Sequence, residues 1–147
     1  MASRDLYTRL LYARRNPLWG GLAYRLLKLL GAEVPRSVTI GEQVVLEHGG
    51  FGVVVHSAAR IGNRVKIYPG VTLGRADVHK PVEQSKFEGV DVGDDVVLGP
   101  GVKVLCKEGM LKVANGTVLG ANAVLLESTG PYEVWAGIPA KKISARD

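Results

Sequence analysis

The chain of 147 residues has little of several features that mark other classes of protein. Its single cysteine, Cys106, excludes an intramolecular disulfide and a zinc site built from cysteines. No uninterrupted apolar run approaches the length of a membrane-spanning helix. Arg9, Arg14 and Arg15 interrupt the apolar segment near the amino terminus, so we predict no secretory signal and expect a cytoplasmic location.

The excess positive charge is confined to one end of the chain. The net charge is +5, and residues 1–32 account for all of it, because they contain six Arg or Lys residues and one Asp. The balanced remainder has no basic stripe with interleaved aromatic residues, and aromatic residues make up only 6% of the chain. Nucleic-acid-binding proteins usually carry such a stripe, so the sequence does not predict a nucleic-acid partner.

An aliphatic residue recurs at every sixth position through most of the chain, most clearly in residues 92–125. A spacing of six fits neither an amphipathic helix nor an alternating strand. It is typical of a parallel β-helix, in which three hexapeptides form one coil of a prism. Thirteen aliphatic residues are expected to point into the prism: Val34, Ile40, Leu46, Val55, Ile61, Ile67, Leu73, Val92, Leu98, Val104, Val113, Leu119 and Leu125.

Glycine often follows the repeated aliphatic residue, as at Gly62 and Gly93, and we expect the chain to turn tightly there. Smaller or β-branched residues are expected to fill the rest of the interior: Ala59, Val65, Val71, Val102 and Ala123.

Residues 1–32 predict a helical cap on this prism. The first helix is expected over residues 4–15; Asn16 and Pro17 end it and begin a second helix, which stops at Gly31. One apolar face of the second helix is expected to pack on the first coil: Leu18, Leu22, Leu26, Leu29 and Leu30. A basic amphipathic anchor on a membrane surface is the alternative, which we do not prefer because a solenoid needs a cap.

Three interruptions break the repeat in the second predicted unit, residues 33–147. The first adds three residues in a glycine-rich segment around His48, and the third adds three near Cys106. The second is a polar excursion loop over residues 75–91, and a carboxy-terminal tail closes the chain. Long irregular segments in a regular solenoid usually have a function, so we expect binding residues in them.

Several motifs in residues 33–143 resemble hexapeptide-repeat acyltransferases, on the side of the serine O-acetyltransferases. They are Leu-Glu-His-Gly-Gly at 46–50, Val-Thr-Leu-Gly at 71–74, the turns beginning at 98 and 119, and Ala-Gly-Ile-Pro-Ala-Lys-Lys-Ile at 136–143. The resemblance implies a left-handed β-helix, a homotrimer, and acetyl-CoA bound in a groove between adjacent prisms. It implies no metal.

The resemblance also implies catalytic roles. His48 matches the catalytic histidine, and an imidazole suits the chemistry because it can take a hydroxyl proton near neutral pH. Glu33 matches the carboxylate that orients this histidine, although the family usually has Asp there. Glu47 matches an acidic residue that helps hold the acceptor. As plainer alternatives, His48 is a polar turn residue and Glu33 a surface carboxylate.

A second group of residues matches the positions that contact the acyl donor in these enzymes. Gly74 and Arg75 match the region whose backbone amide faces the thioester oxygen. Others match the pantetheine channel and the tail that closes over it: Gly99, Pro100, Val118, Ala121, Ala136, Gly137 and Lys141. The transfer is expected to be direct, so Cys106 is not needed as a nucleophile.

The acceptor is where the sequence departs from the serine acetyltransferases. Those enzymes carry an Arg-His pair at the end of the long loop, and the matching positions here are Glu88 and Gly89. A carboxylate repels the carboxylate that a guanidinium would hold. We therefore expect a sugar-like hydroxyl or amine as acceptor, contacted by Asp77, His79 and Glu88. Serine remains the alternative.

Two alternatives come from other functional classes. The β-helix carbonic anhydrases bind zinc with three histidines, and this chain has three: His48, His56 and His79. Their spacing differs from that family's close pair, and we expect His56 to face solvent at a corner. A non-catalytic scaffold is the second alternative, and it leaves the glycine-rich bulge, the excursion and the tail unexplained.

Overall fold

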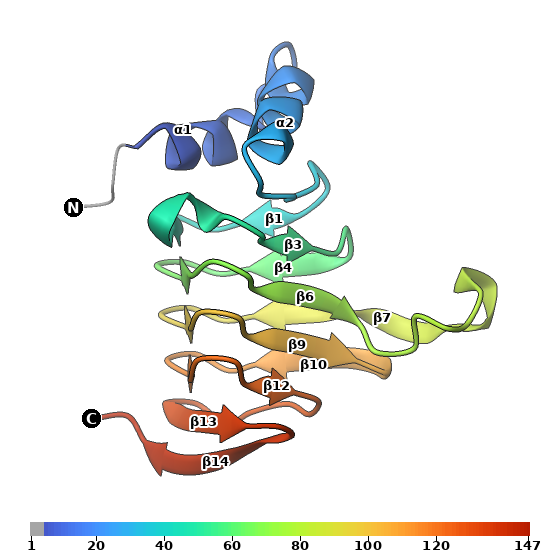
Figure 1. The fold of residues 1–147 in the computed structure, drawn as a ribbon, viewed down its shortest axis with the longest axis vertical. Coiled ribbons are helices and arrows are strands. Elements are labelled where there is room, and N and C mark those ends of the chain that lie inside the picture. The colour runs from blue at the N-terminus through green and yellow to red at the C-terminus, as the bar shows by residue number, and fades with distance from the viewer. Residues whose placement is uncertain (1–4) are drawn as a thin grey trace.

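The computed structural model describes residues 5–147, which form two helices stacked on a parallel β-helix (Figure 1). Helices α1 (Leu6–Ala13) and α2 (Gly20–Leu29) lie at one end, and the short 3₁₀ segments η1 (Glu47–Gly50) and η2 (Val82–Gln84) fall in two of the interruptions. The strands are β1 (Thr39–Ile40), β2 (Val45–Leu46), β3 (Val54–Val55), β4 (Ala59–Ile61), β5 (Lys66–Ile67), β6 (Thr72–Arg75), β7 (Lys86–Val92), β8 (Val97–Leu98), β9 (Lys103–Cys106), β10 (Glu108–Val113), β11 (Val118–Leu119), β12 (Val124–Leu125), β13 (Glu133–Gly137) and β14 (Ala140–Ala145).

These strands form three sheets, which are the three sides of the prism. The first has the order β1-β4-β7-β10, the second β2-β5-β8-β11-β13-β14, and the third β3-β6-β9-β12. Neighbouring strands are parallel except β13 and β14, which form an antiparallel hairpin and close the last coil. None of the helices that residues 5–147 form is long and apolar enough to cross a bilayer.

The strand register follows the hexapeptide repeat and its interruptions. Val54 pairs with Thr72, eighteen residues later, which is three hexapeptides. Val97 pairs with Val118 twenty-one residues later, because one three-residue insertion lies between them. Lys66 pairs with Val97 thirty-one residues later, across the excursion. The prism therefore absorbs each interruption at an edge while its sides stay in register.

The core confirms the predicted repeat. All thirteen repeated aliphatic residues are at most 4% exposed, and the five predicted smaller residues are buried beside them. Burying one such side chain contributes about 1.5–3 kcal/mol, so the repeat supplies most of the driving force for folding.

The glycines after the aliphatic residues have a different purpose from the predicted one. Gly62 and Gly93 do not have a positive φ; the left-handed residues come two positions later, at Arg64 and Asp95. A Cβ on Gly62 would lie 2.7 Å from the carbonyl carbon of Gly93 on the next coil. Glycine is needed because successive coils approach closely here, whereas the turn itself is made elsewhere.

The capping residues that predicted the helix ends are present, but the exact boundaries of the helices differ from the prediction. The Asp5 side chain caps α1 by accepting a hydrogen bond from the Thr8 amide at 2.8 Å. The Asn16 side chain accepts from the amides of the next turn, although regular α2 begins only at Gly20. Gly31 has a φ of 111°, as a helix-ending glycine should. Residue 4, where the first helix was expected to start, lies outside the described residues.

The prediction that the leucine face of α2 packs on the first coil was wrong. The five leucines are 38–84% exposed, and the buried face of the helix is Gly20, Ala23 and Leu27. A Cβ on Gly20 would lie 2.3 Å from the Arg14 carbonyl oxygen, so small residues let α2 approach the chain beneath it. The helix therefore presents its larger apolar side chains to the outside.

Arg14 fastens this cap to the prism. Its side chain is 2% exposed and donates hydrogen bonds to the carbonyl oxygens of Leu11, Val34 and Pro35. Burial, with repulsion from neighbouring arginines, lowers the pKa of Arg14 to about 10. The cap is thus held by polar contacts to the first coil together with the buried Leu27.

The predicted excursion loop is shorter than residues 75–91, because its second half is a strand. Residues 86–92 form β7, which pairs with β10 and β4, and β10 exists because the third interruption extends the chain beside it. Figure 1 shows the segment 76–88 projecting from one edge of the prism. We call residues 76–88 the arm.

Candidate functional site

The candidate residues gather at two different edges of the prism. One edge contains the turns that follow β2, β5, β8 and β11, with the end of β13; we call it the small-residue edge. The other contains the turns that follow β3, β6 and β9, and we call it the arm edge. In Figure 1 the η1 segment and the arm lie on opposite sides of the molecule.

His48 lies at the head of the small-residue edge, in the η1 bulge. Its φ is 53° and that of Gly49 is 78°, a left-handed pair that a non-glycine residue adopts only when its surroundings hold it. A Cβ on Gly49 would lie 2.9 Å from the ring of Tyr7, so α1 presses directly on the bulge. The His48 ring is exposed, with its centroid 6.3 Å from that of Tyr68 on the next coil.

Glu33 does not contact His48 through any hydrogen bond in the described chain. Its carboxylate instead pairs with Lys28 at 3.1 Å and accepts a longer bond from Tyr24, both on α2. The hydrogen bond to Glu33 raises the pKa of Lys28. The predicted His48–Glu33 dyad is therefore not formed in this structure. The second predicted neighbour, Glu47, is half-buried beside His48 in η1.

Below His48, the small-residue edge is lined by backbone and small side chains from successive coils. The Gly99 amide donates to the Leu119 carbonyl at 3.0 Å, and the Gly120 amide to that of Trp135 at 2.9 Å. A Cβ on Gly99 would lie 2.7 Å from the Leu119 oxygen, so the coils leave no room for a larger residue. This column contains most residues of the predicted donor channel: Gly99, Pro100, Val118, Ala121, Ala136 and Gly137.

Lys141 lies at the foot of this column. It is exposed on β14, in register with Ala136 on β13. Its neighbour Lys142 is engaged with Glu133 at 3.2 Å. Of the two lysines, Lys141 is thus the one without such a pairing to Glu133, and its position beside the column suits an anion at that end.

Gly74 and Arg75, predicted to join the donor channel, lie at the other edge. Arg75 ends β6 and organises the arm: its Nη2 donates to the carbonyls of Asp77 and Lys80 at 3.2 and 2.9 Å. Its Nε lies 3.4 Å from the Asp77 carboxylate, whose side chain is 3% exposed. Burial raises the pKa of Asp77, but the Ser85 hydrogen bond and the charge of Arg75 outweigh this and lower it. Asp77 is therefore a buried support of the arm, and the prediction that it contacts the acceptor is not supported.

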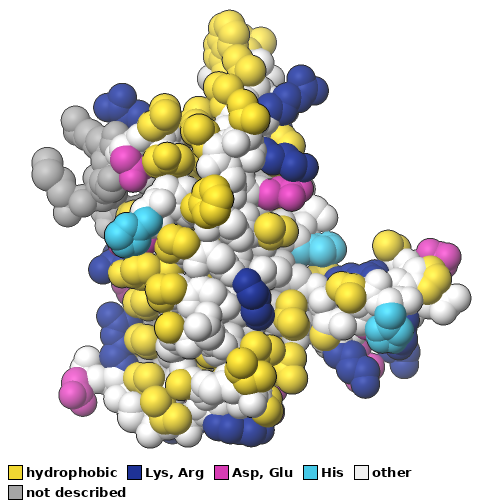
Figure 2. All heavy atoms as spheres, viewed as in Figure 1, with side chains coloured by type: hydrophobic (Ala, Val, Ile, Leu, Met, Phe, Trp, Pro, Cys, Tyr) yellow, Lys and Arg dark blue, Asp and Glu magenta, His cyan; other side chains and the backbone are white. Residues whose placement is uncertain are grey.

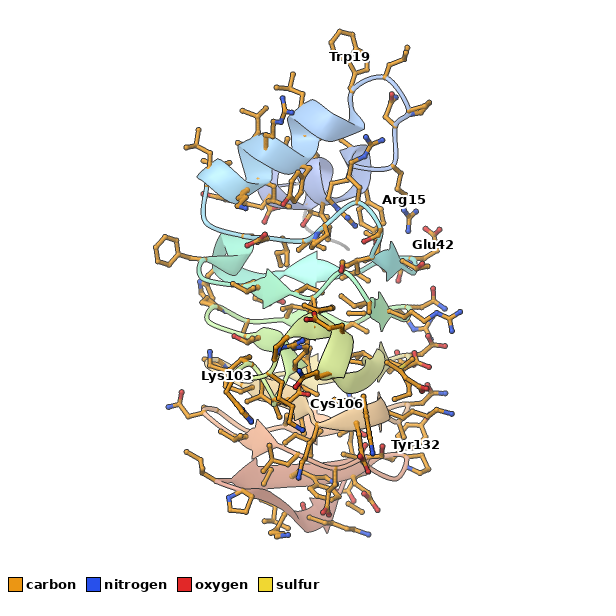
Figure 3. All side chains as sticks on the ribbon, turned by 90° about the vertical axis from the view of Figure 1, so that its right-hand side faces the viewer. Arg15, Trp19, Glu42, Lys103, Cys106 and Tyr132 are labelled. Atoms are coloured by element: carbon orange, nitrogen blue, oxygen red, sulfur yellow. The ribbon has the colours of Figure 1, made fainter. Side chains whose placement is uncertain are left out.

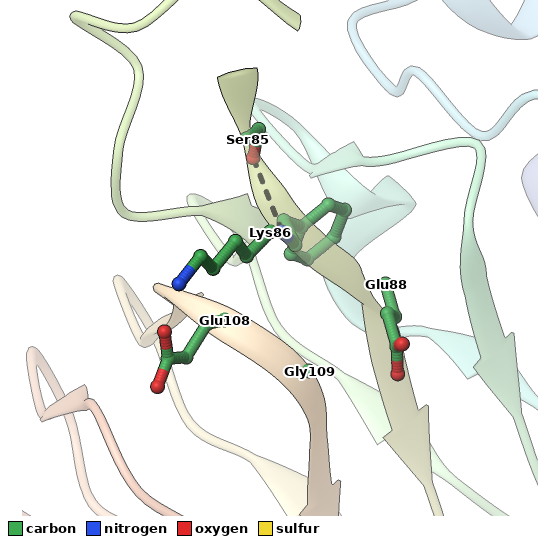
Figure 4. Close-up of a pocket in the computed structure, with 6 residues that line it drawn as sticks. Ser85, Lys86, Glu88, Glu108 and Gly109 are labelled. Atoms are coloured by element: carbon green, nitrogen blue, oxygen red, sulfur yellow. Dashed lines mark hydrogen bonds between the residues drawn. The ribbon is translucent and has the colours of Figure 1, made fainter. Parts of the chain in front are cut away.

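The other two predicted acceptor residues are exposed on or beside the arm. His79 lies in its loop, and Glu88 lines an open groove of about 770 Å³ between β7 and β10. Figure 4 shows Lys86 and Glu108 on one side of this groove and Glu88 on the other. Neither His79 nor Glu88 lies at the edge that carries His48, so one chain brings Glu47 beside His48 but not these two predicted acceptor residues.

His56 is a candidate that the sequence reasoning missed. It was expected to face solvent, but it is half-buried in a cavity of about 210 Å³ with Arg75, Val82 and Phe87. Its Nδ1 accepts from the Ala58 amide at 3.0 Å, and its ring meets that of Phe87 edge-on at 4.7 Å. Burial, then the charge of Arg75, lowers the pKa of His56. The arm supplies the cavity wall, so nothing in the repeat could have revealed it.

Two serine acetyltransferases match most of the chain in sequence. Those of Staphylococcus aureus (strain Mu50) and Staphylococcus epidermidis (strain ATCC 12228) are each 36% identical over 109 residues, which are 74% of this chain and 47% of those proteins. The chain spans about half the length of these curated relatives. No model of a protein family matches it.

Solved structures agree with the sequence comparison. The soybean serine acetyltransferase apoenzyme has a TM-score of 0.77 and 28% identity, over 95% of this chain and 58% of that one. A serine acetyltransferase in complex with CoA has a TM-score of 0.69 and 28% identity, over 93% and 54%. The chain is a serine acetyltransferase-like, hexapeptide-repeat protein. Its prism is the left-handed β-helix.

Two observations concern a cysteine nucleophile and a metal site in this serine acetyltransferase-like chain. Burial raises the pKa of the Cys106 thiol, which donates to the carbonyls of Glu108 and Gly109 at 3.3 Å each. Between residues 5 and 147, no group of three His, Cys, Asp or Glu side chains is placed to hold a metal ion. The three histidines, in particular, do not gather.

Proposed function

We propose that this chain is an acetyl-CoA-dependent acetyltransferase that acetylates a hydroxyl or amine of a small polar acceptor, with His48 as general base. The observation that carries the proposal is the position of His48 at the head of the small-residue edge. A donor lying along that edge has its thioester beside the imidazole. The similarity to a serine acetyltransferase solved with CoA supports the same placement.

The proposed reaction is a direct transfer between two bound substrates. The acceptor hydroxyl gives its proton to His48 as its oxygen attacks the thioester carbonyl carbon. The tetrahedral intermediate then collapses, the carbon–sulfur bond breaks, and the CoA thiolate takes the proton from His48. Cys106 has no part in these steps, because its thiol is buried with a raised pKa. The proposed reaction includes no direct contact between Glu33 and His48, because the Glu33 carboxylate is paired with Lys28.

We further propose a cytoplasmic homotrimer in which each site lies between two copies. The η1 bulge and the arm occupy opposite sides of a single prism (Figure 1). A ring of copies, each joined head to tail, brings the small-residue edge of one to the arm edge of the next. Such an interface unites His48 with the cavity at His56 and Arg75.

Serine is the second candidate acceptor, and two observations favour it over the sugar that the sequence predicted. The relatives are serine acetyltransferases, and a soybean structure of this kind was solved with serine. Arg75 also supplies a guanidinium beside the arm cavity, and its Nη1 is buried and hydrogen bonds to no described residue. That group offers the carboxylate clamp which Glu88 and Gly89 lack.

Measuring CoA-thiol release from acetyl-CoA tests both proposals. Serine and a panel of sugars and amino sugars are offered to the wild type and to His48→Ala. We expect acceptor-dependent release that falls by about 10² to 10⁴ in the variant, the usual contribution of a general base. CoA binding by calorimetry serves as the folding control and should be retained.

Each outcome assigns the function. Serine as best acceptor selects the second candidate, and a sugar or amino sugar selects the first. No release with any acceptor, together with no CoA binding, would leave a non-catalytic scaffold. Full activity in His48→Ala would refute the assigned base.

A further inference from the structure

The outer face of the helical cap carries a large apolar surface that the fold does not cover. It consists of Leu18, Trp19, Leu22, Leu26, Leu29 and Leu30, which are 38–84% exposed, and we call it the Leu–Trp surface. Figure 2 shows hydrophobic side chains gathered at this end of the molecule with basic side chains beside them. In Figure 3, Trp19 lies at the very tip.

Helix geometry explains why these residues face outward together. At 3.6 residues per turn, Leu22, Leu26 and Leu29 fall on one side of α2, and the buried Ala23 and Leu27 fall on the other. Scattered exposed leucines need no explanation, but a contiguous apolar face on a terminal element marks an interaction site.

The charges around the surface distinguish between its possible partners. Arg25 is exposed on the same helix, as is Lys28, whose charge is partly balanced by its ion pair with Glu33. By sequence, residues 1–32 carry +5 while the rest of the chain is neutral, although Arg14 is buried and takes no part in the surface. A second copy would bring two caps of like charge together, which opposes association. An anionic lipid surface complements both the charge and the exposed leucines. Tryptophan at the tip also suits an interface, because its ring is apolar and its indole N–H is polar.

We propose that the Leu–Trp surface docks the cap on the surface of an anionic lipid bilayer. The leucines and Trp19 enter the boundary between headgroups and acyl chains, and the flanking basic residues meet the lipid phosphates. The helices lie on the membrane without spanning it. This proposal is independent of the acetyltransferase proposal, because it uses none of the residues at the two edges.

The arrangement has a consequence for the candidate site. Tyr7 of α1 covers Gly49, so the η1 bulge belongs to the coil directly beneath the cap. Coils are stacked about 4.8 Å apart, and a docked molecule therefore carries His48 close to the bilayer surface.

Co-sedimentation of the full chain with lipid vesicles tests the proposal. Vesicles of phosphatidylglycerol and phosphatidylcholine are compared with vesicles of phosphatidylcholine alone. We expect binding to the anionic vesicles that weakens as salt is raised. The double variant Leu22→Glu/Leu29→Glu should bind at least about tenfold more weakly, because it places carboxylates in the apolar face. Arg25→Gln should weaken binding to a smaller extent.

A matched control variant distinguishes docking through the Leu–Trp surface from non-specific hydrophobic binding to lipid. Leu126 is 51% exposed, near the opposite end of the prism, and Leu126→Glu should leave vesicle binding unchanged. Quenching by brominated lipid adds a local readout. Trp19 is 65% exposed and should be quenched, whereas Trp135 is 7% exposed and should not, so Trp19→Phe removes the quenching.

The outcomes are distinguishable. Binding that requires anionic lipid and is lost in Leu22→Glu/Leu29→Glu supports the proposal. Absence of binding to anionic vesicles overturns it, as does equal binding by the double variant. If the double variant instead lowers the mass of the particle by analytical ultracentrifugation without lipid, and wild type ignores vesicles, the surface joins copies of this chain and the proposal is refuted.

Discussion

The two candidate edges of the prism differ in how they are built. The small-residue edge below His48 repeats from coil to coil, with Gly99 and Gly120 donating to the coil beneath them. The arm edge departs from the repeat, and its order comes from specific polar contacts of Arg75 with Asp77 and Lys80. A regular edge suits a long, extended ligand, and an irregular one suits selective contacts. The difference is the reason why we propose donor binding at the first edge and acceptor selection at the second.

The largest expected effect is on turnover, when a variant of one edge is combined in the same oligomer with a variant of the other. His48→Ala damages the small-residue edge, and Arg75→Gln should loosen the arm and lower activity by about 10², the scale of a small misplacement of substrate. Co-refolding the two inactive proteins should restore about a quarter of wild-type turnover, because one site in four then combines two intact edges in a closed ring. Turnover that stays at the level of the separate variants would show that each site lies within one chain.

A pair of glycine variants compares the tightness of the two edges. Gly99→Ala should destabilise the protein by about 1–3 kcal/mol, because its Cβ would lie 2.7 Å from a backbone oxygen. Gly74→Ala meets nothing within 4 Å and should be neutral or stabilise by up to about 1 kcal/mol. Urea unfolding measures both. Equal losses would mean that the two edges are packed alike.

The pH dependence of the free energy of unfolding tests the burial of His56 at the arm edge. Burial lowers the pKa of His56 in the folded state, so that state favours the neutral ring. As pH falls below the ordinary value of 6.5, the unfolded chain binds a proton before the folded one does, and stability decreases until the folded pKa is reached. The dependence should diminish in His56→Asn, measured by urea unfolding across this range. An NMR titration of His56 at or above 6.5 would contradict the assignment.

The smallest effect is expected at Cys106, where β9 ends at the arm edge. A buried thiol with a raised pKa presents little thiolate, so a disulfide reagent should modify it only as the protein unfolds. Cys106→Ala should retain turnover. Rapid modification of the native protein, with loss of activity, would place a reactive group at the arm edge and reopen a covalent route.

The repeated side chains could be read from the sequence because each one reports the same local environment. Leu46, Leu98 and Leu119 occupy equivalent positions on one side of the prism, and all are buried. The interruption of that pattern indicated a site near His48, and the resemblance to serine acetyltransferases gave this residue its predicted role. The repeat places Gly99 and Ala121 in equivalent turns, but their predicted role in the donor channel came from the same resemblance and stays a prediction. Periodicity by itself supports the assignment of the buried positions.

The cap and the arm could not be read in this way. The leucines of α2 form a convincing inward face by pattern, yet Gly20 and Ala23 decide the packing because they allow the closer approach. Likewise, β7 exists because β10 lies beside it, although the two segments are far apart in sequence. His56 becomes half-buried only when the arm folds over it.

The sequence alone determined the prism, its coil length and the edge on which His48 stands, because a six-residue period with its aliphatic residues turned inward is typical of a parallel β-helix. The left hand of the coil was not contained in that period and came from the family resemblance. The tertiary structure decided everything that depends on contacts between non-repeating segments. It paired Glu33 with Lys28, buried Asp77 against Arg75, separated the arm from His48 and turned the leucines of the cap outward. Those outcomes depend on the sizes of side chains that pack together and on ion pairs between distant segments, which no local sequence pattern contains.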